Sequence, residues 1–566
     1  MAEQEVSRRS FLTSLAAAGA AVAGAGLVAC TPKADKPKEG AAGQTPTIAW
    51  DKEADFVVVG SGTAAWGAVK AAHLGLSVIV LEKSPTWWGG TSATCSGCLW
   101  LPCNYLMDEF GRPDDRGEAI KFMKIMANGQ VADDVIESFV DNSPELALFG
   151  RDVINAQWGL MEETKAWGPL PIYIYDDRGG DICRSLNTEV PDWGNGSAGA
   201  AGFLWSQLHD KLIELGGEII MGAEGKKLIQ DETGAVIGIE AETEAGTIRV
   251  HANKGVLLGT GGFDYNEEYR HAFLKVPIIN SCTVSTDTGD GITMGMQVGA
   301  QMRGLSNVYG EGIWLSPKDY TGPDMFIHNL DDRDSTFSPR SNPNSIIVNK
   351  HGRRFGNESS SYCVWNRAYE SFDTGHLDEN WEGYFIADKT YTEHYVLPLA
   401  SRMDHSANAS DIGFVPDAYV QADTLEELAE KLGIDKDGLI DSVKRYNEYC
   451  KEGKDYDFAR GESVWGQFVG CDRTDRTDLV NKAMGPIENP PFYATMILPG
   501  SLGTSGGLVI NANAQVLDWN NKPIKGLYAS GLAALSVFGT GYPGCGAPIG
   551  SGSVMSFAAA KHAATL

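Results

Sequence analysis

A glycine-rich loop near the end of the chain carries the residue types needed to hold a polarised carbonyl group. The segment 539-GTGYPGCG-546 has one tyrosine, Tyr542, among four glycines, and an alanine-rich helical pattern follows it. Glycines let backbone N–H groups approach a ligand closely, and the start of a helix adds positive dipole character. A phenol beside an exposed amide, here that of Gly546, can stabilise negative charge as it develops on a carbonyl oxygen.

A nucleotide-binding pattern lies near the start of the chain. Residues 55–59 are an apolar run typical of a buried parallel strand, and the motif 60-GSGTAA-65 leads from it into a helical pattern. A second apolar run, residues 77–81, ends in Glu82. The glycines allow a tight turn that admits a pyrophosphate to the helix N-terminus, and the acid binds a ribose hydroxyl. This order of elements predicts an α/β dinucleotide-binding unit.

Small residues also gather in three later segments, 89-GGTSATCSG-97, 255-GVLLGTGGF-263 and 526-GLYASG-531. Together with residues 55–83 they resemble the FAD-binding parts of the fumarate reductase/3-ketosteroid dehydrogenase flavoprotein superfamily, and the resemblance extends over residues 52–566. It implies an α/β fold: a Rossmann-like FAD-binding domain of the two-dinucleotide-binding type, with an inserted α+β substrate-binding lid domain. The implied cofactor is FAD.

The resemblance also implies domain boundaries and cofactor contacts. Residues 51–302 and 487–566 form the FAD-binding domain, and the lid is residues 303–486, where the glycine motifs stop and Trp, Tyr, Pro and charged residues dominate. The predicted cofactor contacts are Gly60, Gly62, Ala65, Glu82, Lys83, Gly89, Gly90, Thr91, Ser92, Gly97, Thr260, Gly261, Asp290, Gly506, Gly531 and Ile549.

The charged residues that a dicarboxylate site needs are missing from the corresponding motifs. Fumarate reductases carry an arginine where this chain has Tyr542, a histidine before the Gly-Gly of 499-PGSLGTSGGL-508, and an arginine after the lid's Asn-Glu, where this chain has Tyr362. Neutral hydroxyls and backbone amides suit a ketone better than a dicarboxylate. The stretches Leu502–Gly507 and Tyr542–Gly546, with the lid tyrosine, resemble the 3-ketosteroid dehydrogenase branch.

That branch implies a role for each position. Tyr542 and the Gly546 amide hold the substrate carbonyl oxygen, Tyr362 exchanges a proton with the adjacent carbon, and flavin N5 exchanges hydride with the carbon beyond. Polarising the carbonyl acidifies the adjacent C–H, so a phenol can act as acid or base towards the enolate. Tyr173 or Tyr175 supports the proton relay; the alternative for both is an ordinary packing residue.

The same residues serve desaturation of a ketone or reduction of an enone, since the step is microscopically reversible. The sequence favours reduction of a steroid-like, hydrophobic enone, because an exported protein of this fold resembles a terminal reductase fed by a membrane-linked cytochrome or quinol carrier. One alternative is a reductase of small unsaturated acids such as fumarate, acrylate or urocanate, with Arg340, Arg367 or Arg402 as its cations. Another is a lipoprotein that binds flavin or a solute without turnover.

The N-terminus indicates export. Residues 7-SRRSFL-12 are typical of a twin-arginine signal, and the short apolar run after them ends in 27-LVAC-30, which resembles a bacterial lipobox. We expect residues 1–30 to be the signal, Cys30 the lipid-bearing residue, and residues 31–50 a tether. The mature protein would then sit on the extracytoplasmic face of the cell membrane. A plain signal peptide with an incidental cysteine is the alternative.

The net charge and the cysteine content indicate whether the chain binds nucleic acid, forms disulfides or holds a metal. A net charge of −28 argues against nucleic acid and for a soluble surface. Ten cysteines do not make a disulfide framework in 566 residues. The spacing Cys95-x-x-Cys98-x4-Cys103 lacks a nearby fourth ligand, so we expect packed thiols rather than a metal or iron–sulfur site. Cys545 lies between the two predicted carbonyl-binding donors, where it would tune or block the site.

Overall fold

The structure is a computed structural model. It describes residues 48–160, 182–190, 194–195, 200–328, 339–399, 412–463, 465–466 and 476–566. The predicted Tyr173, Tyr175, Arg402 and Cys30 lie outside these residues. By its internal contacts the chain divides before Trp50, and every helix and strand of the described residues belongs to the unit Trp50–Leu566.

An eight-stranded sheet confirms the predicted α/β class. Five strands run parallel in the order β21-β10-β1-β2-β7, while β20 pairs antiparallel with β21, and β9 joins β10 and β8 in antiparallel pairs. The bounds are β1 Lys52–Val59, β2 Val78–Glu82, β7 Glu218–Met221, β8 Glu224–Gln230, β9 Val236–Thr243, β10 Gly246–Leu258, β20 Gln515–Leu517 and β21 Pro523–Ala529. The apolar residues 56–59 of β1 are fully or almost fully buried, as expected of a central parallel strand.

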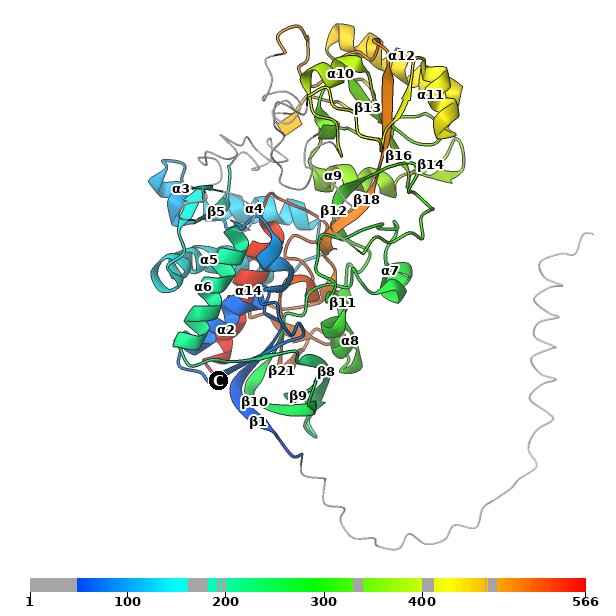
Figure 1. The fold of residues 1–566 in the computed structure, drawn as a ribbon. Helices are drawn as coiled ribbons and strands as arrows, with labels where there is room; N and C mark the ends of the chain where they lie inside the picture. Colours follow the sequence, from blue (N-terminus) through cyan, green and yellow to red (C-terminus); the bar gives the residue numbers. More distant parts are fainter. Residues whose placement is uncertain are drawn as a thin grey trace, which may run out of the picture. The chain divides into compact units, whose positions relative to one another are not determined.

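Two helices of small residues lie against this sheet and against each other (Figure 1). Helix α2 (Ala64–His73) contacts β1 and β2, and α14 (Ala547–Ala563) contacts β10 and β21. A Cβ on Gly67 would lie 2.6 Å from the carbonyl oxygen of Ser556, and one on Gly552 would collide with Oγ1 of Thr63. The two helices therefore approach to backbone contact, which brings the end of the chain beside its first strand.

A helical layer and a small antiparallel sheet flank α14. Helices α3 (Tyr105–Glu109), α4 (Arg116–Ala127), α5 (Asp133–Phe149) and α6 (Ala200–Glu214) accompany strands β3 (Cys98–Trp100), β4 (Trp158–Leu160), β5 (Ser185–Val190) and β6 (Gly194–Asn195). The carboxylate of Asp114 accepts two 2.7 Å hydrogen bonds from Arg184, and both side chains are buried. This ion pair fixes the loop before α4 to the start of β5.

A second, five-stranded sheet is antiparallel, in the order β12-β18-β16-β13 with β17 paired to β18. Its strands are β12 Val308–Leu315, β13 Ser345–Val348, β16 Gly383–Ala387, β17 Val420–Ala422 and β18 Phe492–Thr504, with helices α9 (Tyr362–Asn366), α10 (Lys389–His394), α11 (Leu425–Leu432) and α12 (Lys436–Glu452) around it. This α+β composition agrees with the predicted inserted lid. The boundaries at 303 and 486 stay predictions.

Short elements connect the two sheets. They are α7 (Glu267–Phe273), α8 (Asp290–Gln297), and the pair β11 (Met302–Arg303) and β19 (Gly507–Leu508). The pair β14 (Phe372–Asp373) and β15 (Asp378–Glu379) follows β13 and precedes β16 in the chain. Helix α8 begins at Asp290, a predicted cofactor contact, and β19 begins at the second glycine of the Gly-Gly in the 499–508 segment. Both lie beside the cofactor region described below.

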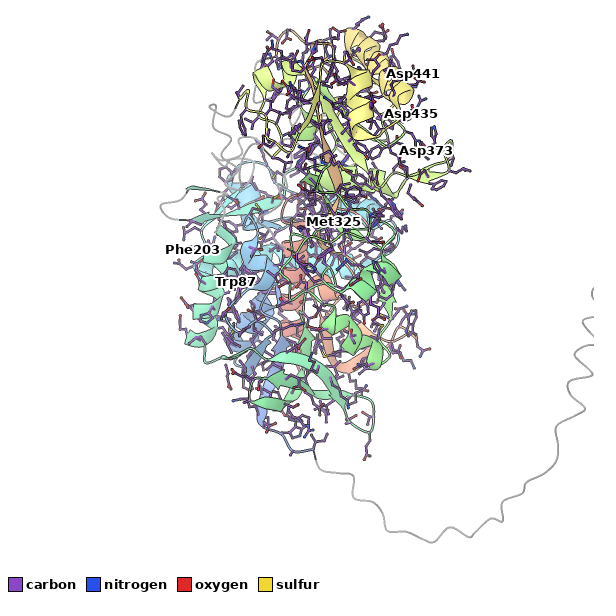
Figure 2. The ribbon with its side chains drawn as sticks, turned by 45° about the vertical axis from the view of Figure 1, so that its right-hand side comes forward. Trp87, Phe203, Met325, Asp373, Asp435 and Asp441 are labelled. Carbon is purple, nitrogen blue, oxygen red and sulfur yellow. The ribbon has the colours of Figure 1, made fainter. Side chains whose placement is uncertain are left out.

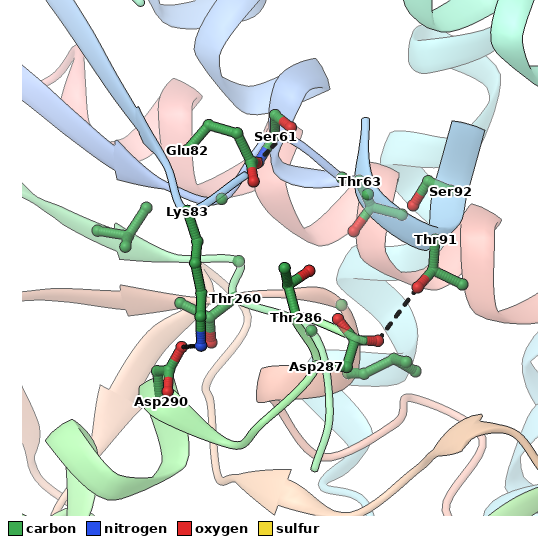
Figure 3. A pocket seen from close by; sticks show the side chains of 18 of the residues that line it. Ser61, Thr63, Glu82, Lys83, Thr91, Ser92, Thr260, Thr286, Asp287 and Asp290 are labelled. Carbon is green, nitrogen blue, oxygen red and sulfur yellow. Dashed lines mark hydrogen bonds and ion pairs between the residues drawn. The ribbon is translucent and has the colours of Figure 1, made fainter. Parts of the chain in front are cut away.

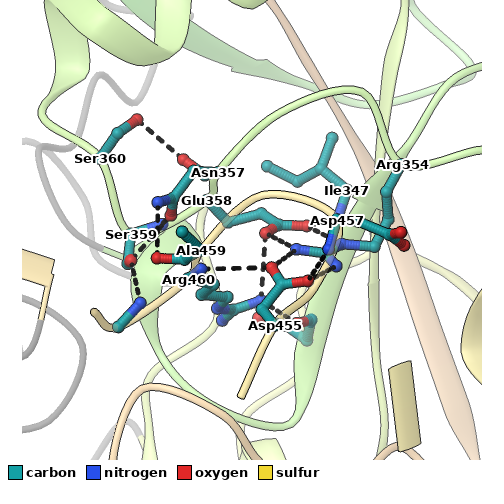
Figure 4. Close-up of polar contacts among 12 residues, drawn as sticks. Ile347, Arg354, Asn357, Glu358, Ser359, Ser360, Asp455, Asp457, Ala459 and Arg460 are labelled. Atoms are coloured by element: carbon teal, nitrogen blue, oxygen red, sulfur yellow. Dashed lines mark hydrogen bonds and ion pairs between the residues drawn. The ribbon is translucent and has the colours of Figure 1, made fainter. Parts of the chain in front are cut away.

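A buried ion network holds the segment that precedes α9 (Figure 4). The guanidinium of Arg354 donates to both oxygens of Glu358, at 2.8 and 2.6 Å, and to both oxygens of Asp455, at 3.1 and 2.9 Å. Arg460 lies 3.5 Å from Glu358 and donates to the Ser345 carbonyl. Burial opposes ionisation of Asp455, but the Arg354 guanidinium holds the pKa of this carboxyl below its usual value.

Acidic side chains account for the strongly negative net charge and lie largely on the surface. Asp435 and Asp441, at and within α12, are exposed (Figure 2). Large apolar side chains reach the surface singly, as Trp87 does with 46% exposure. None of the helices in the described part of the chain combines the length and the apolar character needed to cross a bilayer.

We expect Asp455→Asn to destabilise the fold by about 3–5 kcal/mol, because it leaves the buried Arg354 short of a counter-charge. The measurement is urea denaturation of the FAD-loaded protein. Asp141→Asn is the control, since it breaks an equally well-formed double hydrogen bond to Arg116 whose side chains are about half exposed. Equal losses from the two variants would contradict the role given to the buried network.

Candidate active site

A cleft opens at the carboxyl ends of β1, β2 and β10 (Figure 3). Gly60, Glu82 and Gly259 stand at these three strand ends and line it. The cleft has about 820 Å³ of empty space, counting space open to solvent. In open α/β sheets this edge is where nucleotides bind.

Most of the predicted cofactor contacts share this cleft. Twelve of the sixteen line it: Gly60, Gly62, Glu82, Lys83, Gly90, Thr91, Ser92, Thr260, Gly261, Asp290, Gly531 and Ile549. They come from six separate parts of the chain, so the sequence motifs converge on one site. The helix starts of α2, α8 and α14 lie among these parts, and helix starts favour the negative charge of a pyrophosphate.

The other four predicted contacts, Ala65, Gly89, Gly97 and Gly506, do not line the cleft. Ala65 is buried within α2. A Cβ on Gly89 would lie 2.7 Å from the Trp205 ring, and one on Gly97 3.0 Å from the backbone of α6. A Cβ on Gly506 would collide with the backbone of Gly304. Small residues at these positions allow close packing of neighbouring segments, which the sequence pattern does not distinguish from ligand contact.

The first glycine turn and the acid at the end of β2 are joined by hydrogen bonds. Gly60 has a φ of +96°, and a Cβ there would collide with the Gly259 carbonyl. Ser61 donates to Glu82 from its amide (2.9 Å) and its hydroxyl (2.5 Å), and the Ser84 amide donates to the other oxygen (2.8 Å). Glu82 is thus held at the strand end, where a nucleotide ribose would meet it.

Lys83 ties β2 to α8 at the edge of the cleft. Its ammonium lies 3.0 Å from Asp290 and 2.8 Å from Glu224, and it donates to Thr288 at 2.7 Å. Burial opposes the charge, but the two carboxylates raise the pKa of Lys83. Lys83 therefore keeps its charge and stays paired with Asp290 (Figure 3).

Asp287 is a cleft residue that the sequence patterns did not single out. Its carboxyl accepts a hydrogen bond of 3.1 Å from Thr91. Burial, followed by the nearby Asp264, raises the pKa of Asp287 well above its usual value. The sequence did show two acids in 287-DTGD-290, but it predicted only Asp290 as a cofactor contact. A neutral carboxyl here would present an O–H to a bound ring system.

Two catalytic candidates from distant parts of the chain meet beyond this cleft. The hydroxyl of Tyr362, the first residue of α9, lies 2.6 Å from that of Tyr542. Their exposed fractions are 3% and 6%, and their ring centroids are 5.3 Å apart. Tyr309 of β12 packs edge-on against Tyr542 and donates to Ser536. Motifs identified the first two residues, whereas Tyr309 stands in no motif.

Gly546, the third catalytic candidate, precedes α14. Its φ is +80°, and a Cβ would lie 2.5 Å from the Cys98 carbonyl, so the position requires glycine. Cys545 lies against Cys98, and hydrogen bonds from the Cys98 thiol, from Ser96 and from the Gly546 amide lower the pKa of Cys545. The amide predicted to bind a carbonyl oxygen therefore already has a polarised sulfur as its neighbour.

The cysteine spacing in the sequence does not describe the cluster that forms. Cys95 and Cys98 lie near Cys545, and burial raises the pKa of Cys95 to about 12. Cys103 instead has a φ of +55° and donates its amide to Asp114 at 3.0 Å. No disulfide links the cysteines of the described residues, and no group of three or more His, Cys, Asp or Glu side chains there could hold a metal ion.

Comparison with known proteins places this geometry in a family. The model of the FAD binding domain family matches residues 55–549. The chain belongs to this family. Its twelve cleft residues fit FAD, because the positive-φ glycines and the acid at the end of β2 are what a flavin nucleotide requires.

Two relatives and one solved structure share nearly the whole chain. A 3-oxosteroid 1-dehydrogenase of Mycolicibacterium smegmatis is 30% identical over 90% of this chain and 97% of its own. The digoxin reductase of Eggerthella lenta is 26% identical over 100% and 98%. A 3-ketosteroid delta1-dehydrogenase from Sterolibacterium denitrificans, in complex with 1,4-androstadiene-3,17-dione, has a TM-score of 0.77 at 27% identity over 91% and 100%. The chain is an FAD-dependent oxidoreductase acting on CH–CH bonds.

We expect Gly60→Ala to abolish stable FAD binding, because its methyl group would displace Gly259 from the cleft wall. The measurement is the ratio of flavin to protein absorbance after purification. Gly75→Ala is the matched control: Gly75 also has a positive φ, +87°, but a Cβ there meets nothing within 4 Å. A Gly60→Ala protein with a full complement of FAD would show that this turn does not hold the cofactor.

Proposed function

We propose that this enzyme reduces the C=C bond of a steroid-like enone, and that desaturation of the corresponding ketone is the same reaction in reverse. The observation that carries the proposal is the 2.6 Å contact between the buried hydroxyls of Tyr362 and Tyr542. The relatives named for ketosteroid chemistry and for digoxin reduction support the substrate class.

Each of the three residues has a defined task in the proposed reaction. Tyr542 and the Gly546 amide donate hydrogen bonds to the substrate carbonyl oxygen and stabilise the charge that develops there. Tyr362 delivers its proton to the carbon next to the carbonyl as the C=C bond is lost. When bound and reduced, FAD would supply the hydride for the carbon beyond. In the reverse direction Tyr362 removes the proton.

A small unsaturated acid is the weaker candidate. Of the arginines considered as its cations, Arg340 is 1% exposed and donates to the Ser360 carbonyl at 2.5 Å. The side chain of Arg367 is half exposed, 4.0 Å from Glu370. Neither provides the open guanidinium fork that binds a carboxylate. The phenol pair offers hydrogen bonds without a counter-charge, which suits a ketone.

We expect Tyr362→Phe to slow substrate reduction by about 10²–10⁴-fold while FAD binding is unchanged, because the substrate loses its proton donor. The measurement is anaerobic reoxidation of the reduced flavin by a 3-keto-4-ene steroid, a 3-keto-1,4-diene steroid, fumarate or urocanate. Tyr391→Phe is the control, since it removes an equally buried hydroxyl, bonded to Asn342. Reoxidation by fumarate or urocanate alone would assign the enzyme to the small-acid reductases.

We further propose that the protein is exported by the twin-arginine pathway and held by a lipid on Cys30 at the extracytoplasmic face of the membrane. Its electrons would come from a membrane-linked cytochrome or quinol carrier. The motifs 7-SRRSFL-12 and 27-LVAC-30 support this proposal. Export of a folded protein suits an enzyme whose cofactor is inserted before transport.

We expect Cys30→Ser to move the enzyme from the membrane fraction to the soluble extracytoplasmic fraction, because the acyl anchor is lost. Replacing Arg8 and Arg9 by lysine should retain it in the cytoplasm. The measurement is cell fractionation followed by immunoblotting. Membrane association that survives Cys30→Ser would rule out the lipid anchor.

A further inference from the structure

Tyr542 stands in a loop whose own backbone does little to hold the phenol in place. The segment 539–546 contains four glycines, and glycine backbones adopt many conformations. Helix α4 supports the backbone of the loop: a Cβ on Gly541 would lie 2.8 Å from the carbonyl oxygen of Met126. This contact does not fix the phenol ring, so the orientation of the ring depends on the side chains that pack around it.

Tyr309 of β12 contacts this loop at two points. Its ring packs against the Tyr542 ring with the centroids 5.6 Å apart and an angle of 65° between the ring planes. Its hydroxyl donates a 2.6 Å hydrogen bond to the Ser536 hydroxyl. Ser536 also accepts from the Phe538 amide, through its side chain at 3.1 Å, and from the Gly539 amide, through its carbonyl at 3.0 Å. Tyr309 thus bonds to the residue that anchors the start of the loop.

The strand pair that carries Tyr309 is irregular at this residue. The register between β12 and β18 shifts there, so two residues of β18, Leu502 and Gly503, lie opposite Tyr309 alone. Gly503 has a φ of +137°, and Leu502 lines the cofactor cleft. β-Bulges often occur next to active sites, where they re-aim a side chain. One strand of this bulge borders the cleft, and the other contacts Tyr542.

We propose that Tyr309 is a positioning residue that holds the Tyr542 phenol where the substrate carbonyl oxygen binds, through ring contact and through Ser536. This inference rests on the proposed function of Tyr542. A hydrogen-bond donor stabilises a developing oxyanion only if it is already aimed at the position that the oxyanion takes. A displacement of about 1 Å can slow a reaction by about 10²-fold.

The chemistry of Tyr309 suits a fixed hydrogen bond rather than proton transfer. The exposed fractions of Tyr309 and Ser536 are 3% and 4%. Burial raises the pKa of Tyr309, and the hydrogen bond to Ser536 only partly opposes this shift. The hydroxyl therefore stays protonated and continues to donate to Ser536. A group that transfers protons works best with a pKa near the working pH, and burial moves Tyr309 away from it.

The first test is anaerobic reoxidation of the reduced flavin by 1,4-androstadiene-3,17-dione. Tyr309→Phe keeps the ring and loses the bond to Ser536, and should be about 10-fold slower, whereas Tyr309→Leu also loses the ring and should be about 10²-fold slower. The limiting rate, and its ratio to the half-saturating steroid concentration, should fall by the same factor, because the lost interaction acts in the transition state. FAD content should not change.

Tyr391→Phe is the matched control and should keep the wild-type rate. Tyr391 is fully buried, bonds to Asn342 and packs edge-on against Phe385 with the ring centroids 5.5 Å apart. Its variant therefore loses a comparable hydroxyl from a comparable aromatic contact. Ser536→Ala removes the other partner of the Tyr309 hydrogen bond. It should slow the reaction as Tyr309→Phe does, and combining the two changes should add no further loss.

A second measurement reports the position of the phenol without turnover. It is the infrared C=O stretch of 1,4-androstadiene-3,17-dione, labelled with ¹³C at the ring ketone and bound to the oxidised enzyme, which has no hydride to transfer. Hydrogen bonds from Tyr542 and the Gly546 amide should lower this frequency in the wild type. The frequency should rise in Tyr309→Phe, rise further in Tyr309→Leu, and stay at the wild-type value in Tyr391→Phe.

Each outcome supports or overturns the inference. Wild-type rates and frequencies in both Tyr309 variants, alongside a slow Tyr362→Phe, reject the role of Tyr309 alone. A slower rate with an unchanged frequency also rejects it, because Tyr309 would then act through the general fold. No reoxidation of the wild type by the steroid, or full activity in Tyr362→Phe, rejects the proposed function itself. If Tyr309→Leu does not fold, Tyr309→Phe and Ser536→Ala decide, since each removes only a hydroxyl.

Discussion

The backbone contact between α2 and α14 is the constraint on which the rest of the molecule depends. The Ser556 hydroxyl donates a hydrogen bond to the Thr63 carbonyl at 3.0 Å. The same hydroxyl accepts a hydrogen bond from the Gly67 amide at 3.2 Å. Gly552 and Ser556 of α14 lie against Thr63 and Gly67, so the start of α2 meets α14 about one turn beyond the start of α14. One start carries the glycine turn at Gly60, and the other carries Gly546. The packing of α2 against α14 thus positions both the cofactor cleft, at Gly60, and the catalytic candidates, at Gly546, although the two helices come from opposite ends of the chain.

The buried ion pairs of the fold lie apart from the catalytic candidates Tyr362 and Tyr542. Two buried clusters pair charges of opposite sign, the Arg354 network and the Asp114–Arg184 pair. The catalytic candidates Tyr362 and Tyr542 instead carry phenols, which are neutral in their protonated form. The low dielectric around them strengthens each hydrogen bond to a developing oxyanion, and no fixed charge has to be desolvated when a hydrophobic substrate enters. An apolar ketone is the kind of molecule that gains from this arrangement.

The sequence predicted the parts of the site that obey backbone rules. The turn at Gly60 needs a positive φ and a strand on each side, and both are visible in the pattern of residues 55–82. Tyr362 and Tyr542 were found through motifs. Asp287 and Tyr309 were not, because their importance arises from what packs against them rather than from their neighbours in sequence. Cys103 illustrates the converse: its spacing suggested a cluster with Cys95, yet its positive φ turns it toward Asp114.

The two phenols come from segments 180 residues apart, and both side chains are buried away from solvent. Replacing one of them by arginine would bury a cation opposite a neutral phenol, which costs several kcal/mol in the ligand-free enzyme. Two such replacements would place like charges together until a diacid arrived. The evolutionary route from ketone to dicarboxylate specificity therefore passes through poorly folding intermediates. This barrier gives a physical reason for the two chemistries to persist as separate lineages on one scaffold.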